Sequence, residues 1–308
     1  MPEIKTIHEG DTAQQKVLLG IGLAVLATLI WSGNFIIARE VIKDIPPVTL
    51  AFYRWLSATI ILLPFAWKYI LPGGRFVRQR PWYFLLAAVT GVSMFNTFVY
   101  IAGHYSTAIN MALLGTCSSP IISVILARIF LMEHIPLLRI VGMVVCIAGV
   151  LFLLSKGDLS NLVHFRFTKG DWWVLAAAFS FAVYNTSVKK KPLNMPSVGF
   201  LFVVFLLGTF LLAPIYFLEL KTHGGIAVNI SNLGSILYLG LGASVICFLI
   251  WNKTISILGT GRTALFGNLI PVFSSIEAVI LLNEKITTVH LISFILVVTG
   301  LVIANLKK

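Results

Sequence analysis

Long apolar segments alternate with short polar connections along almost the whole chain. We expect membrane spans at 17–38, 47–70, 82–103, 107–131 and 136–154, and again at 170–188, 197–219, 233–255, 262–282 and 286–306. A helix needs about 20 predominantly apolar residues to cross the hydrocarbon core of a bilayer. The pattern therefore predicts an all-α integral membrane protein with ten transmembrane helices, preceded by a polar cytoplasmic tail at 1–16.

The chain repeats itself once, which divides it into a first five-helix repeat at 17–154, a linker at 155–169 and a second five-helix repeat at 170–306. Glycines, prolines and one acid recur at offsets of 150 or 151 residues. The matched pairs are Gly20 and Gly170, Pro46 and Pro196, Pro64 and Pro214, Gly91 and Gly242, Pro120 and Pro271, Glu133 and Glu284, and Gly149 and Gly300. Because five is odd, the second repeat must enter the bilayer in the opposite orientation. Two inverted-topology five-helix repeats are an architecture typical of secondary transporters.

Composition supports a lipid environment, since 58% of residues are hydrophobic and 11% are charged, against about 25% charged in an average soluble domain. The net charge of +12 does not predict a nucleic-acid partner, because lysines and arginines gather in the short connections between spans. The three cysteines lie inside apolar spans and predict neither a disulfide framework nor a metal site.

The distribution of lysine and arginine also predicts the orientation. If the N-terminus is cytoplasmic, fifteen basic residues fall on the cytoplasmic side and seven on the other. This excess favours cytoplasmic N- and C-termini in the plasma (inner) membrane.

Two prolines and two charges inside the spans are candidates for a role in function. Pro120 and Pro271 lie near the middle of the fourth and ninth spans, where each removes a backbone hydrogen bond. We expect them to act as hinges or gates, with a packing kink as the alternative. Glu277 is the only acid well inside a span and a candidate for proton or cation coupling, whereas Arg54 is interpreted as a structural charge.

Polar and aromatic side chains within the spans predict a substrate site. Asn96, Tyr100 and His104 are spaced i, i+4 and i+8 and share one helix face. Such a stripe is costly against lipid, so we expect it to face the bundle interior. The candidate substrate-binding residues are Asn34, Asn96, Tyr100, His104, Tyr184, Trp251 and Asn252. Interhelical hydrogen bonding is the alternative for each residue taken alone.

The sequence carries no motif of the common membrane enzymes or ATPases. HExxH, GxSxG and Walker sequences are all missing. We therefore expect neither an enzyme nor a cofactor.

Several short motifs resemble the drug/metabolite transporter superfamily, in particular its ten-span EamA-type branch. They are Trp31-Ser32-Gly33-Asn34-Phe35, Phe52-Tyr53-Arg54-Trp55, and the spacings of Pro120 to Glu133 and Pro271 to Glu284, followed by Gly149 and Gly300. The resemblance implies a basket of ten helices that moves metabolites by alternating access. Within the superfamily the chain looks most similar to bacterial exporters of aromatic and other amino acids.

The combined prediction is a secondary, non-ATP transporter that exports amino acids, aromatic or large apolar ones first, through a central cavity. Asn34, Asn96, His104 and Asn252 would bind the charged groups of the amino acid, while the aromatic candidates would cover its side chain. The alternatives are an exporter of another metabolite or drug and a non-transporting receptor or scaffold. The sequence gives no indication of an oligomeric state.

Overall fold

The computed structural model describes residues 4–41, 45–106, 108–158, 160–163, 167–223, 229–282 and 287–306. In these ranges the chain is helical and contains no strand. The first half consists of α1 (Ile4–Val41), α2 (Pro47–Ala66), η1 (Trp67–Tyr69), α3 (Ile70–Gln79), α4 (Pro81–Ala88), η2 (Val89–Met94), α5 (Phe95–Ala102), α6 (Ala108–Leu131) and α7 (Leu137–Leu154). The second consists of α8 (Ser160–Val163), α9 (Lys169–Lys189), α10 (Ser197–His223), α11 (Ile230–Leu237), η3 (Tyr238–Ile246), α12 (Cys247–Leu258), α13 (Thr260–Leu265), η4 (Phe266–Asn268), α14 (Leu269–Leu282) and α15 (Thr288–Asn305).

Seven helical stretches within the described residues are long and apolar enough to cross a membrane. They are Gln14–Gly33, Pro47–Gln79, Pro81–Ala102, Leu137–Leu154, Ser197–Thr222, Ile230–Leu258 and Thr288–Asn305. Each coincides with one predicted span. The other three predicted spans correspond to α6, to α9 and to the broken helix α13–η4–α14.

Helix α9 shows why one of these three is less apolar than its neighbours. It packs against α6, α5 and η2, and Asp171, Ser180, Asn185 and Ser187 are all buried along it. A helix surrounded by other helices can place polar groups against protein instead of lipid. The polar composition of α9 therefore follows from its interior position.

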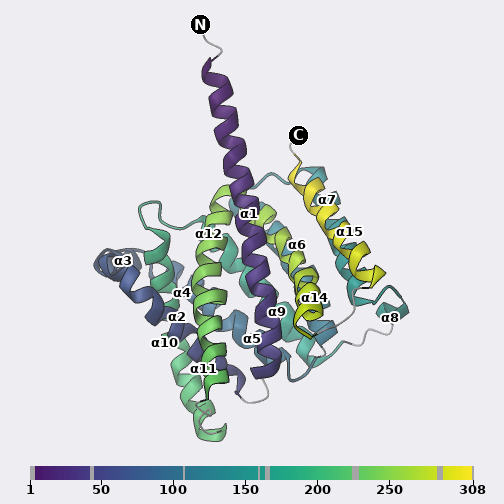
Figure 1. Cartoon of the computed structure of the whole chain (residues 1–308). Helices are drawn as coiled ribbons and strands as arrows, with labels where there is room; N and C mark the ends of the chain where they lie inside the picture. Colours follow the sequence, from purple (N-terminus) through teal and green to yellow (C-terminus); the bar gives the residue numbers. More distant parts are fainter. Residues whose placement is uncertain are drawn as a thin grey trace.

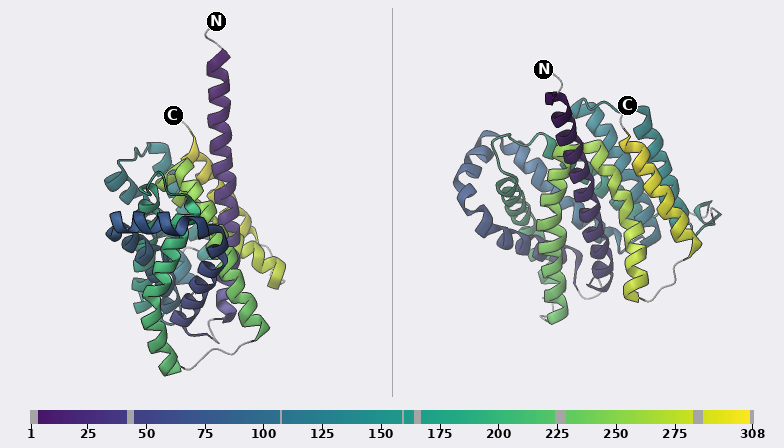
Figure 2. Two further views of the ribbon diagram at one scale, coloured as in Figure 1. Left: turned by 90° about the vertical axis from the view of Figure 1, so that its left-hand side faces the viewer. Right: turned by 45° about the horizontal axis from the view of Figure 1, so that its top comes forward.

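The helices form one bundle with both chain ends on the same side (Figure 1). α7 packs along α15, α2 along α10, and α6 along α9, while α1 lies between α12 and α14. α3 differs from the others because it runs across the bundle (Figure 2). The largest buried side chains, among them Trp55, Tyr184 and Trp251, lie in the interior on α2, α9 and α12.

Two details differ from the simple span pattern. α1 begins at Ile4, ahead of its apolar part, and its N-terminal end projects beyond the bundle (Figure 1). The two prolines also have different surroundings: α6 continues through Pro120, whereas the ninth span is interrupted by the 3₁₀ turn η4 just before Pro271. Proline removes a backbone donor, which favours such an interruption in the preceding turn.

Candidate substrate site

Two π-helical segments occupy corresponding positions in the two halves. η2 covers Val89–Met94 and η3 covers Tyr238–Ile246, and each contains one member of the matched pair Gly91 and Gly242. π-Helical turns inside α-helices occur frequently at functional sites. The tyrosine ring of Tyr184 lies where a Cβ on Gly91 would project, so glycine permits α9 to approach η2 closely.

Arg54 of α2 holds η3 and α5 together in the interior. Its guanidinium donates from Nε to Ser244 Oγ at 2.8 Å, from Nη2 to the carbonyl of Ala243 at 3.1 Å and from Nη1 to Tyr100 Oη at 3.2 Å. Only 2% of the Arg54 surface is exposed. Through these contacts Arg54 joins three separate elements of the bundle, α2, η3 and α5.

An aromatic cluster lies beside Arg54 at the meeting of α1, α9 and α12. We use this name for Trp31, Phe181, Tyr184, Phe248 and Trp251, which are all buried. The ring centroids of Trp31 and Trp251 are 4.9 Å apart, and Phe181 lies 5.8 Å from Trp31. Edge-to-face and tilted arrangements of this kind stabilise aromatic contacts and offer ring faces and edges to a further aromatic group.

Hydrogen bonds fix the polar ends of the aromatic cluster. Trp31 Nε1 donates to the carbonyl of Ala243 in η3 at 2.8 Å. Trp251 Nε1 donates to Asn185 Oδ1 at 2.9 Å, and Tyr184 Oη donates to Asn252 Oδ1 at 3.1 Å. The predicted residues Tyr184, Trp251 and Asn252 are thus brought together by α9 and α12.

Two amide nitrogens beside this cluster have no hydrogen-bond partner in the described part of the chain. They belong to Asn96 and Asn252, and both atoms are buried. Asn96 follows Phe95, whose ring stacks on Phe181 with centroids 4.5 Å apart. A buried amide N–H without a partner is costly, so these two groups are ready donors for a bound acceptor.

The predicted stripe along α5 is only partly interior. Asn96 and Tyr100 are buried, and Tyr100 is bound to Arg54. α5 ends at Ala102, so His104 lies in the following turn and is exposed. The structure therefore does not bring His104 together with the other candidates.

Glu277 connects α14 to α1. Its Oε1 accepts a hydrogen bond of 2.7 Å from Ser32 Oγ, while its Oε2 is buried and has no hydrogen-bond partner among the described residues. Ser274 Oγ, one helical turn earlier, donates to the carbonyl of Ser32 at 3.3 Å. Tyr238 of η3 reaches the same part of α1 and donates to the carbonyl of Ile30 at 2.8 Å.

The structure gives fewer details for the remaining candidates, Pro120, Pro271 and Asn34. Pro120 and Pro271 are buried within α6 and α14. Asn34 lies in α1, but its side chain falls outside the described part of the structure, as does the whole of Glu284. Across the described ranges, no group of three or more His, Cys, Asp or Glu side chains is arranged to hold a metal ion.

Some interior partners were not predicted from the sequence. Asn185 and Ser180 lie on the buried face of α9, where Ser180 Oγ donates to the carbonyl of Thr90 in η2 at 2.8 Å. Ser32 is the partner of Glu277. The matched glycines Gly91 and Gly242 were the available signal for the π-helical segments, because they mark corresponding points in the two repeats.

An all-helical bundle with many apolar spans and a polar, aromatic interior is the architecture of a multi-pass membrane transporter. The EamA-like transporter family model matches the chain twice, at residues 18–155 and 168–306. The chain therefore belongs to the EamA-like transporter family, within the drug/metabolite transporter superfamily.

Curated relatives match over nearly their full length. An uncharacterized transporter of Archaeoglobus fulgidus is 29% identical over 93% of this chain and 97% of the relative. A probable amino-acid metabolite efflux pump of Escherichia coli is 24% identical over 91% of this chain and 93% of the relative. A probable terminal-alkyne amino-acid exporter of Streptantibioticus cattleyicolor is 26% identical, with 94% of each chain covered.

A solved structure shares the fold. It superposes with a TM-score of 0.76 at 18% sequence identity and covers 95% of this chain and 96% of the other. At this identity, the likeness shows the fold alone.

Proposed function

We propose that the protein is a ten-span secondary exporter of amino acids that works by alternating access between two inverted repeats. The packing of the helices supports the repeat. α2 with α10 and α7 with α15 each pair equivalent spans of the two halves. α6 on α9 and α1 on α14 form a further pair of equivalent contacts, as expected when an approximate two-fold axis relates the halves.

The proposed substrate class rests on one observation. The amide nitrogens of Asn96 and Asn252, beside the aromatic cluster, have no hydrogen-bond partner among the described residues. Buried N–H donors suit a carboxylate, because an ionised acceptor makes the stronger hydrogen bonds. Rings of the cluster suit an apolar or aromatic side chain. The names of the Escherichia coli and Streptantibioticus cattleyicolor relatives refer to amino acids and agree with this class.

The π-helical segments supply acceptors for the substrate ammonium. Carbonyl groups of η2 and η3 already accept side-chain hydrogen bonds from Ser180 and Trp31. The widened turn of a π-helix leaves backbone groups available at membrane depth. Asn34 and His104 remain candidates for binding the substrate in a different conformation of the transport cycle.

The hinges of the cycle are Pro120 and Pro271, and Glu277 binds the coupling proton or cation. Both prolines lie in spans that pack on α9 or α1, so bending there changes access to the aromatic cluster. The protein lies in the plasma membrane, and the excess of lysine and arginine favours cytoplasmic termini.

The test is flux of amino acids from proteoliposomes that hold the purified protein, with protein-free vesicles as the reference. We expect saturable transport of tryptophan or phenylalanine, and we expect other amino acids to inhibit it competitively. Phe181→Leu should reduce this flux strongly, because Phe181 lies in the aromatic cluster. Its matched control is Phe210→Leu on α10, where the ring is 75% exposed.

Two results would count against the proposal. Absence of flux for every amino acid, with inserted and folded protein, would reject the amino-acid class. Equal flux in the two phenylalanine variants would reject the aromatic cluster as the substrate site.

A further inference from the structure

The segment 67–82 forms a helical arm that joins the end of α2 to α4. It comprises η1, α3 and the start of α4, and α3 runs across the bundle instead of along it (Figure 2). One side is anchored: a Cβ on Gly73 would lie 3.2 Å from Val203 and 3.8 Å from Met195. Ile70, Phe76 and Val77 also pack against the core. The arm therefore has a fixed orientation.

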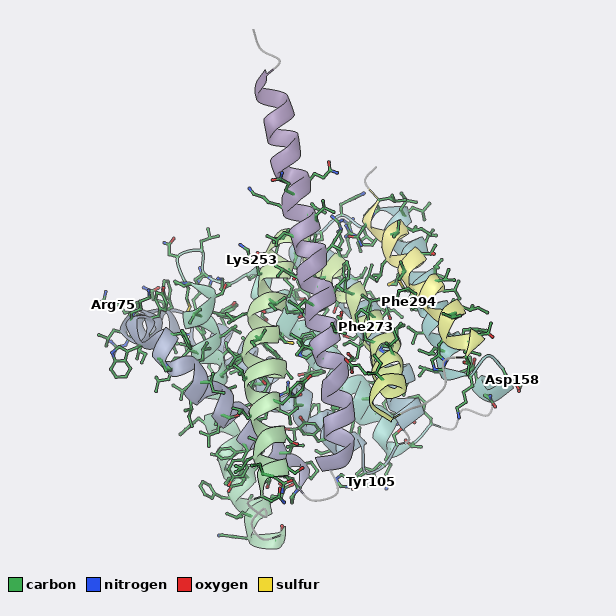
Figure 3. The ribbon with its side chains drawn as sticks, viewed as in Figure 1. Arg75, Tyr105, Asp158, Lys253, Phe273 and Phe294 are labelled. Atoms are coloured by element: carbon green, nitrogen blue, oxygen red, sulfur yellow. The ribbon has the colours of Figure 1, made fainter. Side chains whose placement is uncertain are left out.

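The exposed residues of this arm include large apolar groups as well as arginines. Trp67, Leu71 and Trp82 are 70%, 83% and 79% exposed. Arg75 and Arg78 follow Leu71 at i+4 and i+7, so the three share one helix face. Figure 3 places Arg75 at the outer edge of the bundle. We call these exposed residues, together with Lys68 and Arg80, the α3 surface.

The α3 surface carries positive charge without acidic compensation from its own part of the chain. Lys68, Arg75, Arg78 and Arg80 fall within thirteen residues, and no Asp or Glu occurs between Asp44 and Glu133. Positive charge continues in the adjacent loop that contains Lys191 and Met195. Lys191 Nζ donates to the carbonyl of Met195 at 2.9 Å, and Met195 in turn approaches Gly73.

Lys191 is itself affected by a further cation, Lys253. Burial, and then the positive charge of Lys253, lower the pKa of the Lys191 ammonium. A negative group at this end of the bundle would relieve the repulsion between these cations.

From this geometry we propose that the α3 surface binds the headgroups of anionic phospholipids, with Trp67, Leu71 and Trp82 reaching the boundary between headgroups and acyl chains. Tryptophan is enriched at that boundary. A helix with apolar groups and arginines on its exposed face is suited to lie in the interface and attract anionic lipid. A soluble anion would gain nothing from the exposed apolar groups, which favours a lipid.

The test is competitive lipid retention measured by native mass spectrometry of the full-length protein in detergent. The protein is offered equal amounts of phosphatidylglycerol and phosphatidylcholine. We expect wild type to retain phosphatidylglycerol in several-fold preference, and Arg75→Gln/Arg78→Gln to lower that preference at least threefold.

The matched control removes two exposed charges at the other end of the bundle. Lys169→Gln/Lys221→Gln makes the same change in net charge. Lys221 follows Glu219, which binds the first turn of α2, whereas α3 follows the last turn of α2, about 30 Å away for a helix of this length. We expect this control to keep the wild-type preference.

A second measurement uses wild type alone and so does not depend on the folding of a variant. Salt at about 1 M shortens the Debye length to about 3 Å, and should abolish the preference for phosphatidylglycerol. Excess inorganic phosphate should leave it in place.

Three outcomes would overturn the proposal. They are equal retention of the two lipids by wild type, an unchanged preference in Arg75→Gln/Arg78→Gln, and displacement of lipid by inorganic phosphate alone. The last outcome would assign the surface to a free anion.

Discussion

Glu133, just after the end of α6, accepts a hydrogen bond of 3.0 Å from the backbone N–H of Thr260, the first residue of α13. Its second carboxylate oxygen accepts from the N–H of Gly261 at 3.4 Å. Gly259 has φ +84°, and a Cβ there would lie 3.2 Å from both carboxylate oxygens. A carboxylate just after one proline-containing span thus caps α13, the helix that begins the other.

We predict that Glu133→Ala lowers stability by about 1 kcal/mol, the usual cost of losing a helix cap. It should also change the rate of transport, because the contact joins the two spans proposed to hinge. Thermal unfolding in detergent and flux from proteoliposomes measure the two effects.

The matched control is Glu219→Ala. Glu219 of α10 caps α2 in a similar way, accepting from the N–H groups of Val48 at 3.2 Å and Thr49 at 2.6 Å. α2 and α10 do not contain the proposed hinges, so we expect a similar loss of stability without a specific change in rate. Identical flux changes in the two variants would remove any gating role from Glu133.

The contact between α7 and α15 depends on glycine. A Cβ on Gly300 would lie 2.6 Å from the carbonyl oxygen of Gly142 and 2.6 Å from the backbone nitrogen of Cys146. Since backbone atoms cannot yield as a side-chain end can, Gly300→Ala should force the helices apart and cost about 1–3 kcal/mol. Thermal unfolding in detergent should show the loss.

Gly22→Ala is the matched control for Gly300→Ala. A Cβ on Gly22 would meet no atom within 4 Å, and alanine in a helix is favoured over glycine by about 0.5–1 kcal/mol. Gly22→Ala should therefore be neutral or stabilising. A similar loss in both variants would mean that the close approach of α7 and α15 is unimportant for stability.

The sequence predicted the positions of the helices better than the pairing of their side chains. Hydrophobic segments reflect contact with lipid or core over about 20 residues, so seven predicted spans coincide with apolar helical stretches of the structure. The partners Trp251 and Asn185, or Ser32 and Glu277, depend on the register between helices distant in the chain. Local periodicity carries no information on that register.

His104 shows a second limit of prediction from the sequence. Its i+8 spacing from Asn96 is correct for one helix face, but the helix ends at Ala102, and the side chain leaves that face. The ends of helices are the least certain part of a prediction from periodicity.

Arg54 and Tyr100 give a third prediction, on stability. Arg54→Lys keeps the charge but cannot reach Ser244, Ala243 and Tyr100 together, and hydrogen bonds to charged groups are worth about 1.5–3 kcal/mol each. Tyr100→Phe removes one of these bonds and leaves the ring in place. We expect both to lower the thermal unfolding temperature, Arg54→Lys by more. The reverse order would show that Arg54 is not the link between α2, η3 and α5.

Glu277→Gln tests the coupling role of the only acid in α14. Glutamine has nearly the same shape and can still accept the hydrogen bond from Ser32 Oγ, but it cannot bind and release a proton near neutral pH. We expect the variant to exchange labelled amino acid across the membrane while losing the response of flux to an imposed pH gradient. Ser32→Ala, which removes the partner and keeps the carboxylate, should retain that response. A wild type indifferent to the gradient, or a Glu277→Gln variant that responds as strongly as wild type, would exclude Glu277 as the coupling group.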